Sequence, residues 1–132
     1  MIKIKVRNLG EVSNAISSMP LGLRGEAADA ASDYLLGNEQ RGLRHYPAQR
    51  PGQKYIRTYN LRSGWQKDGK GVQIALHNSV EYAPYVQGDD TQAWMHAGRW
   101  HTVTQIFQSN IDGMINAIYQ RWQKWLKGKG LG

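Results

Sequence analysis

Residues 102–128 read TVTQIFQSNIDGMINAIYQRWQKWLKG, and this stretch carries the clearest periodic pattern in the chain. Apolar side chains recur there every three or four positions, which is typical of one face of an amphipathic helix. We therefore expect a long C-terminal helix, with Thr102 as its N-cap and Gly128 at its end. Its core-facing residues should be Phe107, Ile111, Met114 and Ile118.

The N-terminal third of the chain predicts a strand and a helical region. Met1 to Val6 alternates apolar and cationic residues, which is typical of a short strand with one face exposed to solvent. Val12, Ile16 and Met19 follow at helical spacing. Apolar residues from Pro20 to Gly37 again mark one helical face, since proline suits a first turn and glycine suits a helix end.

The middle of the chain predicts a long loop and then a hairpin. Residues 38–54 contain glycines and prolines among arginines and glutamines, with little periodicity, and a loop of this length is often functional. Strands near Ser63–Gln66 and Val72–His77 should pair across a turn at Lys67–Gly71. Asn78–Gly88 should form a turn and a short helical or extended piece.

Together these elements predict a single α+β domain over residues 1–132, in which a small antiparallel sheet is packed by the N-terminal helix region and the long C-terminal helix. The absence of cysteine excludes a disulfide framework, a thiol nucleophile and a thiolate metal site. No signal peptide and no membrane span are expected, because the N-terminus lacks an apolar run and no stretch approaches about 20 apolar residues.

Seventeen lysines and arginines against ten acidic residues give a net charge of +7, which attracts polyanions and acidic surfaces. A small basic nucleic-acid-binding module is therefore the alternative function. A histidine nuclease would need a basic and an acidic imidazole beside a cation. His45, His96, His101, Arg57 and Arg99 supply those residue types, but a count of histidines carries no geometric information. A metal site is not expected either, because His96 and His101 are five apart and do not match the i, i+4 spacing of a helical zinc site.

Other catalytic patterns are missing from the sequence. Ser63-Gly64 lacks the preceding glycine of a nucleophile elbow, and no glycine-rich phosphate-binding motif is present. We therefore predict no catalytic residue, no metal and no cofactor. Five tryptophans and seven tyrosines indicate protein interfaces instead, because aromatic side chains anchor such contacts. The segment 91–102 is too aromatic for an ordinary solvated loop and should be held against something.

Three stretches, taken in order, resemble the neck or tail-completion proteins of long-tailed bacteriophages and prophages. They are Tyr55–Trp65 (YIRTYNLRSGW), Tyr82–Gly88 (YAPYVQG) and Gln92–Trp100 (QAWMHAGRW). The order and spacing match over about Tyr46 to Ile118. The chain departs from the family pattern at Tyr59, where the family often has glycine, and at Gly64, which is inserted before the tryptophan.

The resemblance implies a small α+β subunit without catalytic activity. It would join a homo-oligomeric ring at the junction of capsid and tail and contact neighbouring head-completion and tail proteins. It would act in the virion, and in the host cytoplasm during assembly, with DNA passing through the lumen without specific binding. Residues 82–100 would offer one surface and the basic loop 38–54 another. The interface candidates are Arg57, Tyr59, Leu61, Trp65, Tyr82, Tyr85, His96, Arg99, Trp100, Trp122 and Trp125.

Overall fold

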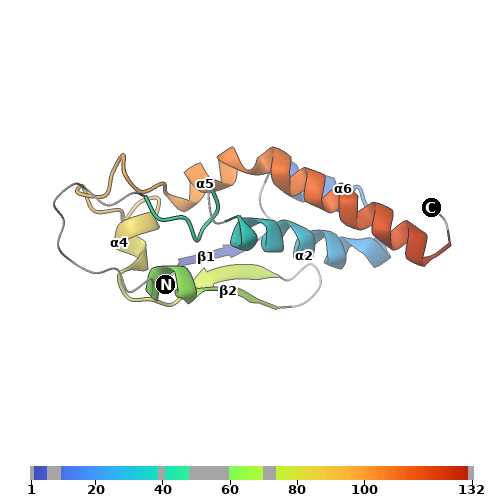
Figure 1. The fold of residues 1–132 in the computed structure, drawn as a ribbon, viewed down its shortest axis with the longest axis horizontal. Helices are drawn as coiled ribbons and strands as arrows, with labels where there is room; N and C mark the ends of the chain where they lie inside the picture. The colour runs from blue at the N-terminus through green and yellow to red at the C-terminus, as the bar shows by residue number, and fades with distance from the viewer. Residues whose placement is uncertain (1, 6–9, 39–40, 48–59, 70–73, 131–132) are drawn as a thin grey trace.

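The computed structural model describes residues 2–5, 10–38, 41–47, 60–69 and 74–130, which form an elongated α+β molecule (Figure 1). The described elements are β1 (Ile2–Lys5), α1 (Gly10–Ser17), α2 (Leu21–Gly37), α3 (Asn60–Gly64), β2 (Trp65–Asp68), β3 (Ala75–Asn78), α4 (Ala83–Gln87), α5 (Val103–Ser109) and α6 (Ile111–Gly128). The predicted fold class is confirmed: helices pack on a small antiparallel sheet, with α6 as the long C-terminal helix.

The sheet has the order β1-β3-β2, and both pairings are antiparallel. The predicted alternation in β1 is confirmed, because Ile2 is buried while Lys3 is exposed. The predicted hairpin is confirmed as well, but β2 begins later than expected. Ser63 and Gly64 belong to α3, and Lys67 and Asp68 belong to β2 rather than to the turn. Residues 70–73, which include the start of the second predicted strand, lie outside the described residues.

Helix α2 is the middle layer, between the sheet and α6 (Figure 1). Packing on two sides explains its composition, because small side chains allow close approach to both neighbours. The buried residues of α2 are Leu23, Ala27, Ala28, Ala30, Ala31, Ser32 and Leu35. The sequence predicted one buried face, and the structure adds Ala28 and Ser32.

The predicted C-terminal helix is wrong in one respect: it is two helices, α5 and α6, separated at Asn110. Asn110 is buried, and its side-chain amide donates to the carbonyl oxygens of Ile106 (2.7 Å) and Arg41 (3.0 Å). Its Oδ1 accepts from Asn38 at 3.2 Å. These bonds tie the break to the C-terminal end of α2, so the chain turns at a fixed point.

The break also changes which apolar residues are buried. Met114 and Ile118 lie in the core as predicted, whereas Phe107 and Ile111 are only half-buried. Both of these residues flank the break, so they do not share the continuous face of a single helix. Thr102 is confirmed as the N-cap of α5: its hydroxyl accepts from the backbone of Gln105, whose side chain accepts from the Thr102 backbone.

Candidate interaction surfaces

A buried glutamine joins α4 to the rest of the core. Gln87 is 1% exposed, and its Oε1 accepts from the indole N–H of Trp65 at 3.0 Å. Its Nε2 donates to the backbone carbonyl of Leu43 at 3.2 Å. Buried polar groups are costly unless they are paired, and here one amide satisfies two partners. The end of α4 is therefore fixed to β2 and to the segment that follows α2.

The segment after α4 is held by hydrogen bonds rather than by regular structure. The side-chain amide of Gln92 donates to the carbonyls of Val86 and Trp100, each at 2.8 Å. The backbone N–H of Ala93 donates to the backbone carbonyl oxygen of Tyr85 at 2.7 Å. These contacts cross-link the segment to α4 and to the approach of α5.

Asp89 adds a further link to α5. Its carboxylate accepts from the backbone N–H and the hydroxyl of Thr104, in the first turn of α5. A carboxylate is stabilised there because the first N–H groups of a helix have no partner within the helix. The segment 88–100 thus has defined anchors at both of its ends.

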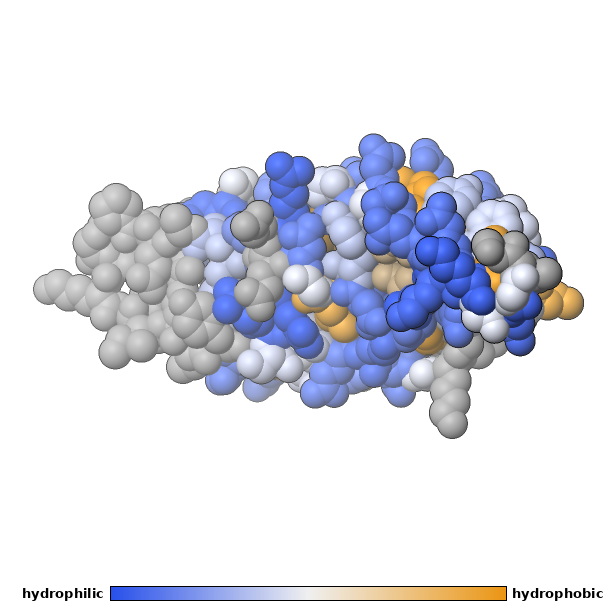
Figure 2. Space-filling view, turned by 45° about the vertical axis from the view of Figure 1, so that its right-hand side comes forward, coloured by the Kyte–Doolittle hydropathy of each residue, from blue (hydrophilic) through white to orange (hydrophobic). Residues whose placement is uncertain are grey.

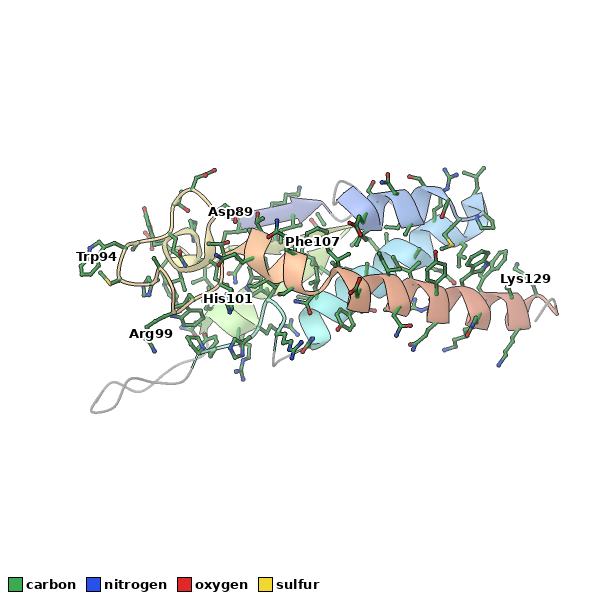
Figure 3. All side chains as sticks on the ribbon, turned by 90° about the horizontal axis from the view of Figure 1, so that it is seen from above. Asp89, Trp94, Arg99, His101, Phe107 and Lys129 are labelled. Carbon is green, nitrogen blue, oxygen red and sulfur yellow. The ribbon has the colours of Figure 1, made fainter. Side chains whose placement is uncertain are left out.

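This anchored segment and α4 present large apolar side chains to solvent. Trp94 is 85% exposed and Tyr85 is 59% exposed, and Tyr82 and Met95 are exposed as well. We call these four residues the aromatic tip; Trp94 projects at one extremity of the molecule (Figure 3). The expectation that the segment is held against something is met at its two ends, whereas the side chain of Trp94 contacts solvent. The backbone bond from Ala93 to Tyr85 brings the two segments together, and exposed apolar groups of this kind can mark an interaction site.

Trp100 is the aromatic residue of this segment that does pack against the core. The ring of Tyr46 meets it edge-on, with centroids 4.9 Å apart, and the His96 ring lies 6.5 Å from it. The Arg62 guanidinium lies over the Tyr46 ring at 5.0 Å, and burial raises the pKa of the Tyr46 hydroxyl. His96 and Trp100 thus support the tip from behind.

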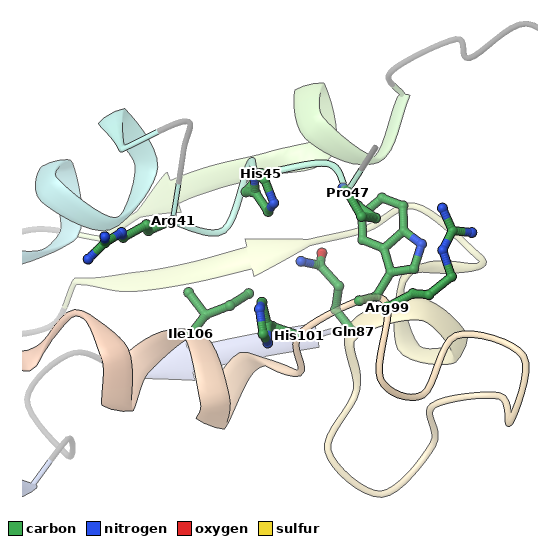
Figure 4. Close-up of a pocket in the computed structure, with 9 residues that line it drawn as sticks. Arg41, His45, Pro47, Gln87, Arg99, His101 and Ile106 are labelled. Carbon is green, nitrogen blue, oxygen red and sulfur yellow. The ribbon is translucent and has the colours of Figure 1, made fainter. Parts of the chain in front are cut away.

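A small depression lies behind the tip (Figure 4); its volume is about 10 Å³, room for about one water molecule. Four basic side chains from two segments border it: Arg41, His45, Arg99 and His101. Its remaining lining residues are Gly42, Pro47, Gln87, Trp100 and Ile106.

The structure thus brings three of the five nuclease candidates, His45, His101 and Arg99, to the same depression. His96 lies beside Trp100, and Arg57 lies outside the described residues. Among the side chains that the structure describes, no group of three or more metal-ligating residues is present.

The opposite end of the molecule carries a second apolar group. Leu21, at the start of α2, is 80% exposed, and the adjacent Gly22 lies beside the ring of Trp125 on α6. Lys129 lies 5.7 Å from the centroid of that ring. Trp122 stacks on Tyr119 with centroids 6.0 Å apart. Trp122 and Trp125 are half-buried and pack against the core, so each offers only part of its surface.

Two interface candidates are core residues instead. Trp65 is fully buried and Leu61 is 2% exposed, so neither offers a surface to a partner. Their aromatic and apolar character, which suggested an interface, serves packing. Arg57 and Tyr59 lie outside the described residues, as does most of the predicted basic loop. Within that loop, Arg44 donates from its guanidinium to the backbone carbonyl of Trp65 at 2.8 Å, so it supports the fold.

A four-residue ion-pair network that no sequence pattern predicted joins β2, α2 and α6. Lys67 contacts Asp29 and Asp33, and Arg121 contacts the same two carboxylates from α6. The hydrogen bond from Lys67 is the main cause that holds the pKa of Asp29 below its usual value, and Asp29 and Asp33 raise the pKa of Lys67. The partners are far apart in sequence, so no local pattern connects them.

No described helix is long and apolar enough to cross a membrane. No protein-family model, no curated protein and no solved structure matches this chain. The resemblance to neck and tail-completion proteins therefore stays a prediction.

Proposed function

We propose that this chain is a virion structural protein that joins the head and tail of a long-tailed phage, as a ring subunit without catalytic activity. One observation carries the proposal: the described residues of the three stretches are linked to one another by side-chain hydrogen bonds. Trp65, from the first stretch, donates to Gln87 in the second, and Gln92, from the third, donates to Val86 in the second. Residues remote in sequence thus cooperate to present a single feature, the aromatic tip.

The construction of the tip suits protein contact. Large apolar side chains bind best when they are held in place beforehand, because less conformational freedom is lost on binding. Here the buried Gln87 and the half-buried Gln92 fix the backbone behind Tyr85 and Trp94. Aromatic anchors of this kind typically account for much of the binding energy of an interface. The partners that the proposal implies are head-completion and tail proteins and further copies of this chain.

The test is made in a phage or prophage that encodes this chain. The double substitution Tyr85→Ser and Trp94→Ser removes two exposed side chains of the tip without touching the core. We expect capsids filled with DNA and complete tails that fail to join, visible by electron microscopy. Gln108→Ser, on the exposed face of α5, is the control and should give joined particles. Normal yields of infectious particles from the double variant, at normal protein levels, would overturn the proposal.

The basic depression favours a second candidate, a nucleic-acid-binding module. Arg41 and Arg99 stand at its border, and phosphate contacts by such side chains make affinity fall with salt by about 0.9 in log-log slope per contact. If this function is the correct one, replacing both arginines by glutamine should lower affinity for DNA and reduce that slope by about 2. A salt slope near zero for the unmodified protein would exclude this candidate.

A further inference from the structure

Among the described residues, most of the exposed large apolar side chains lie toward the two opposite ends of the molecule, and Tyr119 lies in the middle of α6. The aromatic tip forms one end, and the α6 terminus with Lys129 forms the other (Figure 3). At the second end, Gly22, next to the exposed Leu21, lies beside Trp125, and small apolar patches are visible between hydrophilic ones (Figure 2). An elongated molecule with apolar groups at both ends can bind a partner at each of them.

The described residues at the tip are acidic. Residues 78–98 contain Glu81, Asp89 and Asp90 and neither lysine nor arginine. The nearest cation along the chain is Arg99, which borders the depression behind the tip. Glu81 and Asp90 are exposed, while Asp89 is bound to the start of α5. The tip residues therefore combine apolar anchors with neighbouring carboxylates, while the cations Arg62 and Arg99 lie behind them.

The described residues at the other end are basic. After Asp112, helix α6 and the C-cap residue that follows it carry four cations and no carboxylate. One of the four, Arg121, is used in the ion-pair network, which leaves Lys124, Lys127 and Lys129. Arg24 of α2 adds a further positive charge, and the exposed Glu26 offsets one charge. We call this end, with Leu21 and Trp125, the basic end.

We propose that the aromatic tip of one copy docks on the basic end of a second copy, in a head-to-tail contact. This inference rests on the proposed function, since it names the surfaces through which ring subunits would meet. Opposite charges favour this pairing. Contacts of like ends are disfavoured, because a tip against a tip gathers carboxylates and a basic end against a basic end gathers lysines. The contact therefore joins two different surfaces, the type that forms rings or open filaments according to the rotation between copies.

Two variants, each with one inactive end, test the pairing. The tip variant carries Trp94→Ser and Met95→Ser, and the basic-end variant carries Lys124→Glu and Lys127→Glu. All four side chains are exposed, so both variants should melt at the temperature of the unmodified protein. The mass in solution is measured by sedimentation over the micromolar to millimolar range, first for each protein alone and then for an equal mixture.

We expect the unmodified protein to show a mass that rises with concentration, and each variant alone to stay monomeric. The mixture should form a dimer and nothing larger, because the intact tip of one variant can meet only the intact basic end of the other. Raised salt should weaken the association. As a control, Lys3→Glu makes the same charge change on β1 and should associate like the unmodified protein.

A monomeric unmodified protein over the whole range would overturn the proposal, as would a mixture of variants that stays monomeric. A closed dimer formed by either variant alone would show a symmetric contact instead. Tight, salt-dependent binding of a short DNA duplex by the basic end without self-association would show that its partner is nucleic acid. Each of these results leaves the particle-joining test unaffected, so a failure here is distinguishable from a failure of the proposed function.

Discussion

Replacing Gln87 by leucine should destabilise the protein far more than the same change at an exposed glutamine. The substitution leaves the indole N–H of Trp65 and the carbonyl of Leu43 without their partner inside the core. An unpaired buried group costs about 1 to 3 kcal/mol. Because the leucine side chain recovers part of the loss by apolar burial, we expect a net loss of about 2 to 4 kcal/mol.

Urea unfolding followed by tryptophan fluorescence measures the effect of the Gln87 substitution. With a slope of about 2 kcal/mol per molar urea, the midpoint should fall by about 1 to 2 M. The control is Gln108→Leu on α5, which should stay within about 0.5 kcal/mol because its side chain is exposed. In nuclear magnetic resonance spectra, the indole N–H signal of Trp65 should shift in the first variant alone. Equal stabilities for the two variants would refute the reasoning.

Gly113→Ala should destabilise the protein by about 1 to 3 kcal/mol although alanine favours helices, because a Cβ there would overlap the ring of Tyr34. Gly22→Ala is its control and should be neutral or stabilising in thermal melts, since a Cβ there meets Trp125 at an ordinary 3.7 Å; a stabilising Gly113→Ala would contradict this packing. Lys67→Gln should cost stability near neutral pH. The substitution should cost less stability in acid. The pKa of Asp29 is lowered, so its charge stabilises the fold above the ordinary pKa of 3.8, and this stabilisation is lost as pH falls through the folded-state pKa. The pKa of Lys67 is raised, so its charge stabilises the fold below the ordinary pKa of 10.5, and this stabilisation is lost as pH rises through the folded-state pKa. The free energy of unfolding lost in Lys67→Gln, measured across pH, should therefore be constant between the acid and alkaline limits and smaller beyond them. An equal loss of stability at every pH would contradict the assignment.

Periodicity predicted the elements that have one buried face and one face exposed to solvent. The alternation at Ile2 to Lys5 and the three-and-four spacing of Met114 and Ile118 were sufficient for β1 and α6. It did not predict the break at Asn110, because that residue is polar and its role depends on Arg41 and Asn38, which are about 70 positions away. Such long-range hydrogen bonds leave no local pattern in the sequence.

The candidate interface was predicted only in part, because aromatic residues serve cores and surfaces alike. Tyr85 and Trp65 look equivalent in sequence, yet one is 59% exposed and the other is fully buried. The difference depends on Gln87, whose side-chain oxygen accepts a hydrogen bond from the buried Trp65 indole. A glutamine is usually found at the surface, so its residue type does not predict a position in the core.

The length of α6 has a geometric consequence for any assembly built from this chain. Its 18 residues span about 27 Å and fix how far the basic end stands from the break at Asn110. One residue added within α6 would move that end by about 1.5 Å and turn it by about 100°, taking Trp125 away from Gly22. If copies join end to end, the same displacement recurs at every junction. The number of residues in one helix thereby sets both the spacing and the rotation from each copy to the next.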